Sequence, residues 1–118
     1  MRILLIDDET NLLPEYLEDS GHTCETLRWV RDEEWLRSQL DRVRPKAVIL
    51  DFAMKPPGSQ QYEWIKKWDS ATRVVFYTNY AKAGPTHNEM LRVCGEERFI
   101  VAKREAAMDV LDIVAVIS

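Results

Sequence analysis

The sequence predicts an α/β fold: a three-layer, doubly wound, five-stranded parallel sheet with helices on both faces. Short apolar stretches of strand length alternate with stretches in which apolar residues recur at helical spacing. All but one of the strand stretches are almost continuously apolar, which is typical of parallel strands covered on both faces. The connections are short, and right-handed crossovers place the intervening helices on both sides of such a sheet.

The alternation also sets the boundaries of the elements. The expected strands are Arg2–Ile6, Thr23–Leu27, Ala47–Leu50, Arg73–Tyr77 and Arg98–Ala102. The expected helices are Asn11–Asp19, Asp32–Arg44, Gln60–Trp68, Thr86–Cys94 and Glu105–Ile117. In the second helix Leu36, Leu40 and Val43 share one face. The last helix is predicted from its period alone, because its composition is β-branched enough for a strand.

Length and composition favour one globular domain over residues 1–118 with a single core. The chain has 46% hydrophobic and 31% charged residues, unlike a disordered tail, and its formal charge of −4 argues against direct contact with nucleic acid. The first residues, MRILLIDDE, lack the long apolar region and cleavage site of a signal peptide, and no stretch is long enough to span a membrane. We therefore expect a cytoplasmic protein.

The cysteines and histidines do not indicate a metal site. Cys24 and Cys94 form no C-x-x-C pair, so we expect two small buried hydrophobic residues rather than a disulfide or zinc ligands. His22 and His87 have no acidic or cysteine partner at ligand spacing, so we expect both at ordinary polar positions.

Residues suited to phosphate chemistry follow the predicted strands. Asp7 and Asp8 end the first strand, Asp51 the third, Thr78 the fourth and Lys103 the fifth. The carboxyl ends of the strands carry the ligand site in doubly wound folds. Three carboxylates there repel one another unless a cation intervenes, and oxygen-only ligands favour Mg²⁺. A carboxylate can also attack a phosphoryl group, with a metal ion and a lysine neutralising the charge.

Each of these residues also has a simpler interpretation. Asp7 and Asp8 could cap the first helix, and Asp51 could be an isolated polar strand end. Thr78 suits a strand by its β-branching, and Lys103 could be an ordinary exposed lysine. Capping explains one acid more readily than three, so the combination favours the functional interpretation.

At these positions the sequence resembles a response-regulator receiver domain, the phosphoacceptor of two-component signalling. The resemblance covers the whole chain and rests on four motifs in order: ILLIDDE, AVILD with Met54 three residues later, VVFYT and FIVAK. It implies a flavodoxin-like (CheY-like) fold with strand order 2-1-3-4-5. It also implies a protein phosphorylated once on Asp51 rather than a turnover enzyme, with a sensor histidine kinase or a phosphotransfer protein as donor.

The resemblance assigns a role to each site residue. Asp8, Asp51 and the backbone carbonyl of Ala53 would bind Mg²⁺, and Asp7 would act through a bound water. Thr78 and the backbone N–H groups of Ala53 and Asn79 would bond phosphoryl oxygens, and Lys103 would pair with their charge. In the family the output face lies on the fourth helix, fifth strand and fifth helix, which corresponds here to roughly Pro85–Ile117 and would contact an output protein or effector domain.

The chain departs from the family pattern at several positions. Lys55 stands between Met54 and the first proline, and Arg104 replaces the proline that commonly follows the lysine. Ile100 occupies the place of the family's reporting aromatic, while Phe99 is expected on the other face of the strand. Ala53 has no polar side chain to orient an attacking water, which predicts slow self-dephosphorylation.

Two other classes of protein stay open. A pseudo-receiver would keep the fold and act as a phosphorylation-independent interaction module, and the altered surroundings of Lys55 and Arg104 suit it. A flavodoxin-like cofactor binder shares the topology but needs a phosphate-binding loop after the first strand, where DDETN would repel phosphate. A metal-dependent phosphatase is disfavoured because no second acid closely follows Asp51.

Overall fold

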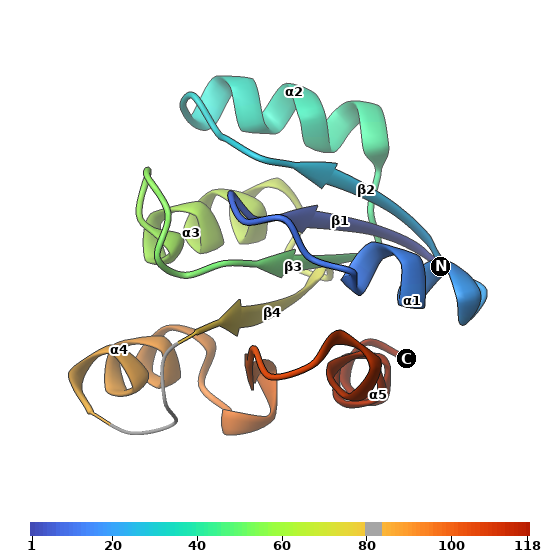
Figure 1. The fold of residues 1–118 in the computed structure, drawn as a ribbon. Helices are drawn as coiled ribbons and strands as arrows, with labels where there is room; N and C mark the ends of the chain where they lie inside the picture. The colour runs from blue at the N-terminus through green and yellow to red at the C-terminus, as the bar shows by residue number, and fades with distance from the viewer. Residues whose placement is uncertain (80–83) are drawn as a thin grey trace.

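Five parallel strands form one sheet in the order β2-β1-β3-β4-β5, as predicted. Figure 1 labels β2, β1, β3 and β4 in this order from top to bottom. The structure is a computed structural model that describes residues 1–79 and 84–118. The strands are β1 (Arg2–Ile6), β2 (Thr23–Leu27), β3 (Ala47–Leu50), β4 (Arg73–Thr78) and β5 (Ile100–Ala102). The helices are α1 (Leu13–Asp19), α2 (Glu33–Val43), α3 (Gly58–Trp68), α4 (Pro85–Cys94) and α5 (Ala106–Ile117), with a 3₁₀ helix η1 (Glu97–Phe99).

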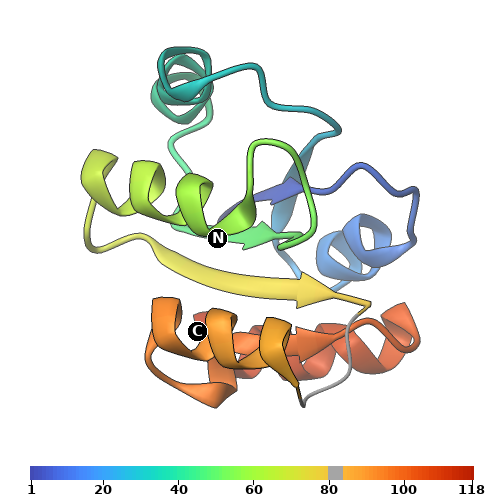
Figure 2. The same ribbon diagram turned by 90° about the vertical axis from the view of Figure 1, so that its left-hand side faces the viewer.

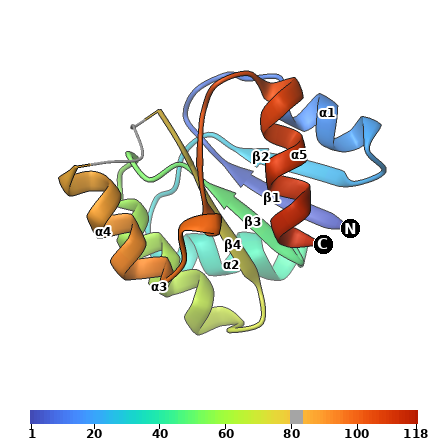
Figure 3. The ribbon, with the colours of Figure 1, turned by 90° about the horizontal axis from the view of Figure 1, so that it is seen from below.

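The sheet separates two helical layers. Helices α1 and α5 cover one face, and α2, α3 and α4 cover the other (Figures 2 and 3). Side chains alternate between two apolar cores along each inner strand: in β1, Leu4 and Ile6 join the core under α2–α4, whereas Ile3 and Leu5 join the core under α1 and α5. Burial on both faces explains why this strand is continuously apolar.

Local sequence accounts for the ends of α2. The Asp32 carboxylate accepts a hydrogen bond from the Trp35 backbone N–H at 2.8 Å and caps the first turn. The helix ends at Val43, and the C-cap residue Arg44 has a left-handed backbone (φ 52°). The predicted helix Asp32–Arg44 therefore contains the helix and both of its caps.

The last strand is shorter than predicted. Residues Arg98 and Phe99 belong to η1, in which the Phe99 N–H donates to the Glu96 carbonyl at 3.2 Å, so β5 begins only at Ile100. Ile100 is buried in the core under α2–α4 and Phe99 packs against the opposite core, which confirms that the two side chains face different ways.

The segment between α4 and β5 also corrects the interpretation of His87. This side chain is buried, with 6% of its surface exposed, and its Nε2 lies 3.3 Å from the Glu97 carboxylate. An acid ten residues later, brought close by η1, is a partner that local spacing does not reveal. The prediction of an ordinary polar position was wrong.

The loop after β3 is packed tightly beside the carboxyl edge of the sheet. Gly58, the first residue of α3, lies so close to Phe52 that a Cβ atom there would stand 2.6 Å from the Phe52 Cα. No other residue type fits this approach without movement of the backbone. The Lys55–Pro56 peptide bond in the same loop is cis.

Within residues 1–79 and 84–118, no helix has both the length and the apolar character required to cross a bilayer.

Candidate functional site

Backbone hydrogen bonds between neighbouring strands carry the predicted site residues to one edge of the sheet. The Asp7 N–H donates to the Leu27 carbonyl at 3.0 Å, and the Asp51 N–H donates to the Ile6 carbonyl at 2.9 Å. The Lys103 N–H donates to the Thr78 carbonyl at 2.6 Å. The backbone hydrogen bonding between strands thus continues one residue beyond β1, β3 and β5. It fixes the backbone positions of Asp7, Asp51 and Lys103.

Lys103 lies at the centre of the site. Its Nζ is 2.8 Å from the Asp7 carboxylate, 3.4 Å from that of Asp51 and 3.4 Å from that of Glu9. The Asp7 and Asp51 side chains are 0% and 5% exposed and that of Lys103 is 11% exposed, so these three charges are largely withdrawn from water. Carboxylates from two strand ends and an ammonium from a third therefore converge, as predicted.

Asp7 is held from several sides. Besides the Lys103 ion pair, one oxygen accepts the Glu9 backbone N–H at 2.9 Å and the other accepts the Asn11 amide at 3.2 Å. Neither Asp7 nor Asp8 caps α1: the N-cap position is Leu12, and the side chain that accepts the Leu13 N–H, at 2.9 Å, is that of Asn11.

The Asp51 side chain lines a cavity of about 190 Å³. One carboxylate oxygen accepts the Ala53 backbone N–H at 3.2 Å and the other faces Lys103. Thr78 is 1% exposed and lines the same cavity. The full lining is Asp8, Glu9, Asp51, Ala53, Thr78 and Asn79.

The donor set at this cavity fits a hard divalent cation. Carboxylate oxygens of Asp7, Asp8, Glu9 and Asp51 lie within 4.8 Å of one another. Mg²⁺ prefers oxygen ligands and binds with one or two carboxylates, retaining waters on its other positions. Asp8 is exposed, so its carboxylate can reach an ion without breaking a buried contact.

Glu9 and the side chain of Asn79 are two site residues that the sequence interpretation missed. The Asn79 amide donates to the Glu9 carboxylate at 2.6 Å, which joins the loop after β4 to the loop after β1. Glu9 directly follows the acidic pair, and that third consecutive acid was the available signal. The Asn79 side-chain contact spans 70 residues and has no local signal.

Burial and charge shift the pKa values of the two central groups. Burial raises the pKa of Asp51, and the charge of Asp7 adds to this, while Lys103 and the Ala53 N–H oppose it; the net shift is upward. Burial alone would lower the pKa of Lys103, but the hydrogen bond to Asp7 and the charges of Asp51 and Glu9 outweigh it, so its pKa is raised. Lys103 is therefore protonated and positively charged at neutral pH.

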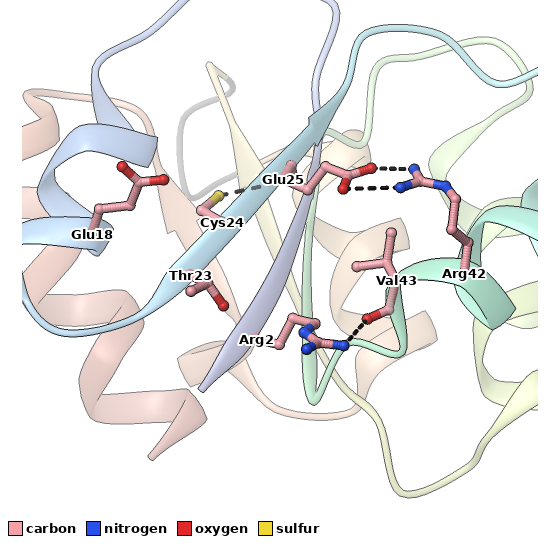
Figure 4. Close-up of a pocket in the computed structure, with 7 residues that line it drawn as sticks. All are labelled: Arg2, Glu18, Thr23, Cys24, Glu25, Arg42 and Val43. Carbon is pink, nitrogen blue, oxygen red and sulfur yellow. Dashed lines mark hydrogen bonds and ion pairs between the residues drawn. The ribbon is translucent and has the colours of Figure 1, made fainter.

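A second cavity, of about 280 Å³, lies on the side of the sheet where β1 and β2 begin, away from the carboxyl ends of the strands (Figure 4). It is lined by Arg2, Glu18, Thr23, Cys24, Glu25, Arg42 and Val43. Both of its lining cations already have partners: Arg42 pairs with Glu25, and the Arg2 guanidinium donates to the Val43 carbonyl at 3.0 Å. Burial, with the nearby carboxylates of Glu18 and Glu25, raises the pKa of Cys24 to about 11, so its thiol is not activated.

No family model and no curated protein sequence matches the chain. Several solved structures match it. NtrX from Brucella abortus superposes with a TM-score of 0.76 at 22% identity, over 98% of this chain and 26% of the NtrX chain. The non-phosphorylated HemR receiver domain from Leptospira biflexa gives 0.75 at 21% identity, over 99% of this chain and 94% of that one. The response regulator TrrA from Thermotoga maritima, in complex with Mg²⁺ and BeF, gives 0.75 at 23% identity, over 99% and 98%.

The chain thus spans about a quarter of the NtrX chain and nearly all of the HemR receiver domain and of TrrA. These likenesses cover the whole sheet and its five helices. Together with the observed strand order, they confirm the predicted fold: the chain has the fold of a CheY-like response-regulator receiver domain.

Proposed function

We propose that the chain accepts a phosphoryl group on Asp51 from a phosphorylated histidine of a sensor kinase or phosphotransfer protein. The observation that carries this proposal is the buried Lys103 ammonium between the Asp7 and Asp51 carboxylates, beside an open cavity. Such an arrangement places a nucleophilic oxygen next to a fixed positive charge, which phosphoryl transfer requires.

In the proposed step an Asp51 carboxylate oxygen attacks the phosphorus atom of the phosphohistidine. A P–O bond forms, the P–N bond breaks, and the imidazole leaves with the electron pair and takes up a proton. The product is an acyl phosphate on Asp51. Lys103 offsets the charge of the phosphoryl oxygens, and Thr78 with the backbone N–H groups of Ala53 and Asn79 would donate hydrogen bonds to them.

We propose that the step requires Mg²⁺, held by Asp8, Asp51 and the Ala53 carbonyl, with Asp7 acting through a water. The ion would supply further positive charge against the phosphoryl oxygens. The acidic cluster supports this requirement, as does the Mg²⁺-BeF complex of the structurally similar TrrA. The chain would be modified once per cycle rather than act as a turnover enzyme.

We further propose that phosphorylation changes contacts with an output protein or effector domain on the face from Pro85 to Ile117. Thr78 and Asn79 line the cavity at the end of β4, and α4 is the next element along the chain. A phosphoryl group that draws Thr78 inward would change the contacts that α4 offers on this face, and a partner that binds only the phosphorylated arrangement would shift the population toward it.

The experiment is the intact mass of the protein after treatment with acetyl phosphate, with and without Mg²⁺. Wild type should gain one phosphoryl group only with Mg²⁺, and Asp51→Asn should gain none. Asp19→Asn, an exposed change at the end of α1, is the matched control and should behave as wild type. A wild-type protein that gains no phosphate, or an equal gain in Asp51→Asn, contradicts the proposal; the first result is the one expected of a pseudo-receiver.

A further inference from the structure

Asp109 is a fully buried carboxylate that the proposed reaction does not use. It lies in the first turn of α5, and its side chain is 0% exposed beside the core formed by α1, α5 and the sheet. Burial of an unpaired carboxylate is costly, so its partners have to be identified.

Two donors reach the same oxygen of Asp109. The Tyr77 hydroxyl on β4 donates to Oδ2 at 2.7 Å, and the Arg104 backbone N–H donates to Oδ2 at 3.0 Å. The Arg104 Nε lies 3.6 Å from Oδ1, an atom that has no hydrogen-bond partner among the described residues. Asp109 therefore joins α5 to β4 and to the loop between β5 and α5.

The Arg104 N–H belongs to the peptide group that follows Lys103. The peptide group before Lys103 is fixed separately, because the Lys103 N–H donates to the Thr78 carbonyl at 2.6 Å. The backbone on both sides of Lys103 is thus restrained, on one side by β4 and on the other by Asp109. This restraint fixes the direction in which the Lys103 side chain leaves the backbone.

Tyr77 provides a second connection between Asp109 and Lys103. Its ring centroid lies 5.5 Å from the Lys103 Nζ, within the range of a cation–π contact, while its hydroxyl bonds Asp109. Burial, reinforced by the hydrogen bond to Asp109, raises the pKa of Tyr77, so the hydroxyl stays protonated as a donor.

We propose that Asp109 is a positioning residue for the Lys103 ammonium, acting through the Arg104 N–H and secondarily through Tyr77. This inference rests on the proposed phosphoacceptor function, in which Lys103 offsets the charge of the phosphoryl oxygens. A proline after the lysine would have no N–H to satisfy, whereas Arg104 has one, and Asp109 is its acceptor.

The test compares Asp109→Ala with two variants that separate positioning from stability. Asp109→Asn keeps a carbonyl oxygen that can accept the Arg104 N–H. Tyr77→Phe removes the hydroxyl bond to Asp109 but leaves the Arg104 contact and the aromatic ring in place. The first readout is the rate of Asp51 phosphorylation by acetyl phosphate at saturating Mg²⁺, corrected for the folded fraction by circular dichroism.

The second readout is independent of phosphorylation. It is the acylation of Lys103 by an amine-reactive reagent, measured by peptide mass spectrometry relative to the exposed Lys67. In the wild type Lys103 should react slowly, because its side chain is 11% exposed and paired with carboxylates.

We expect Asp109→Ala to slow phosphorylation about tenfold or more, since a small misplacement of a charged group is costly in transfer chemistry. Lys103 acylation should rise severalfold in the same variant. Asp109→Asn and Tyr77→Phe should stay close to wild type in both readouts, even where their stability falls. Unchanged Lys103 acylation in Asp109→Ala overturns the inference, and so do equal losses in all three variants. If the wild type takes no phosphate, the proposed function fails on that result alone, while the acylation readout still decides the role of Asp109.

Discussion

Replacing Lys103 with methionine removes a charge from a buried cluster and nearly preserves the volume of the side chain. Asp7 then keeps its neutral hydrogen bonds from Glu9 and Asn11 but loses the ammonium 2.8 Å away, at a position with 0% exposure. Removing one partner of a buried ion pair costs about 3–5 kcal/mol, because the remaining charge is uncompensated. A domain of this size has roughly 5–15 kcal/mol of stability, so the loss is a large share of the total.

The pH range of this stabilisation follows from the raised pKa of Lys103. A cationic group whose pKa is raised by folding stabilises the native state fully below its unfolded value, here 10.5, and loses that contribution as the pH rises through the folded value. The effect of Lys103→Met should therefore be complete at neutral pH.

The assay is urea unfolding without Mg²⁺, followed by tryptophan fluorescence. Lys103→Met should lower the unfolding free energy by about 3–5 kcal/mol, and the double variant Lys103→Met with Asp7→Asn should lose much less than the sum of the single losses. Added Mg²⁺ should restore part of the stability of Lys103→Met, and a concentration of ten times Kd stabilises by about 1.4 kcal/mol. A loss within about 0.5 kcal/mol of zero, which is typical of surface positions, would refute the reasoning.

Further predictions concern the cavity and its surroundings. Ala53→Asn should shorten the lifetime of the acyl phosphate about tenfold by orienting a water, as followed by loss of labelled phosphate; an unchanged lifetime contradicts it. Burial raises the pKa of Asp51 above its unfolded value of 3.8, so between that value and the folded pKa the native state binds more protons than the unfolded state. Without Mg²⁺, the free energy of unfolding should therefore fall as the pH rises through this range. The urea midpoints of Asp51→Asn should lack this decrease. Glu9→Gln should weaken Mg²⁺ binding severalfold in a fluorescence titration, and equal affinity would exclude Glu9 from the cation site. Gly58→Ala should lower the unfolding free energy by about 1–3 kcal/mol, because its Cβ meets the Phe52 backbone; unchanged stability would mean that this loop can move aside.

The sheet and its carboxyl edge could be predicted because both depend on short-range patterns. Apolar runs such as RILLI and AVIL mark strands with two covered faces, and parallel strands present their carboxyl ends on one edge. The positions of Asp7, Asp51 and Lys103 follow directly, since each stands one residue beyond a strand.

Other features depend on contacts between distant segments. The Asn79–Glu9 bond spans 70 residues, and the acceptor of the Arg104 N–H is set by how α5 packs on the sheet. The shortened β5 follows from the η1 turn, whose residues also suit an extended strand by composition. The burial of His87 requires the same turn to bring Glu97 beside it. Local spacing carries no signal for the Asn79–Glu9, Arg104–Asp109 and His87–Glu97 contacts, whereas the shortened β5 reflects a local ambiguity between turn and strand.

The brevity of β5 bears on how the protein meets other molecules. It stands at the edge of the sheet with only three residues, Ile100–Ala102. A short border offers few backbone groups to an incoming extended chain, which is one way that proteins resist edge-to-edge aggregation. Association on this side of the molecule should accordingly use the surfaces of α4 and α5 rather than an extension of the ladder.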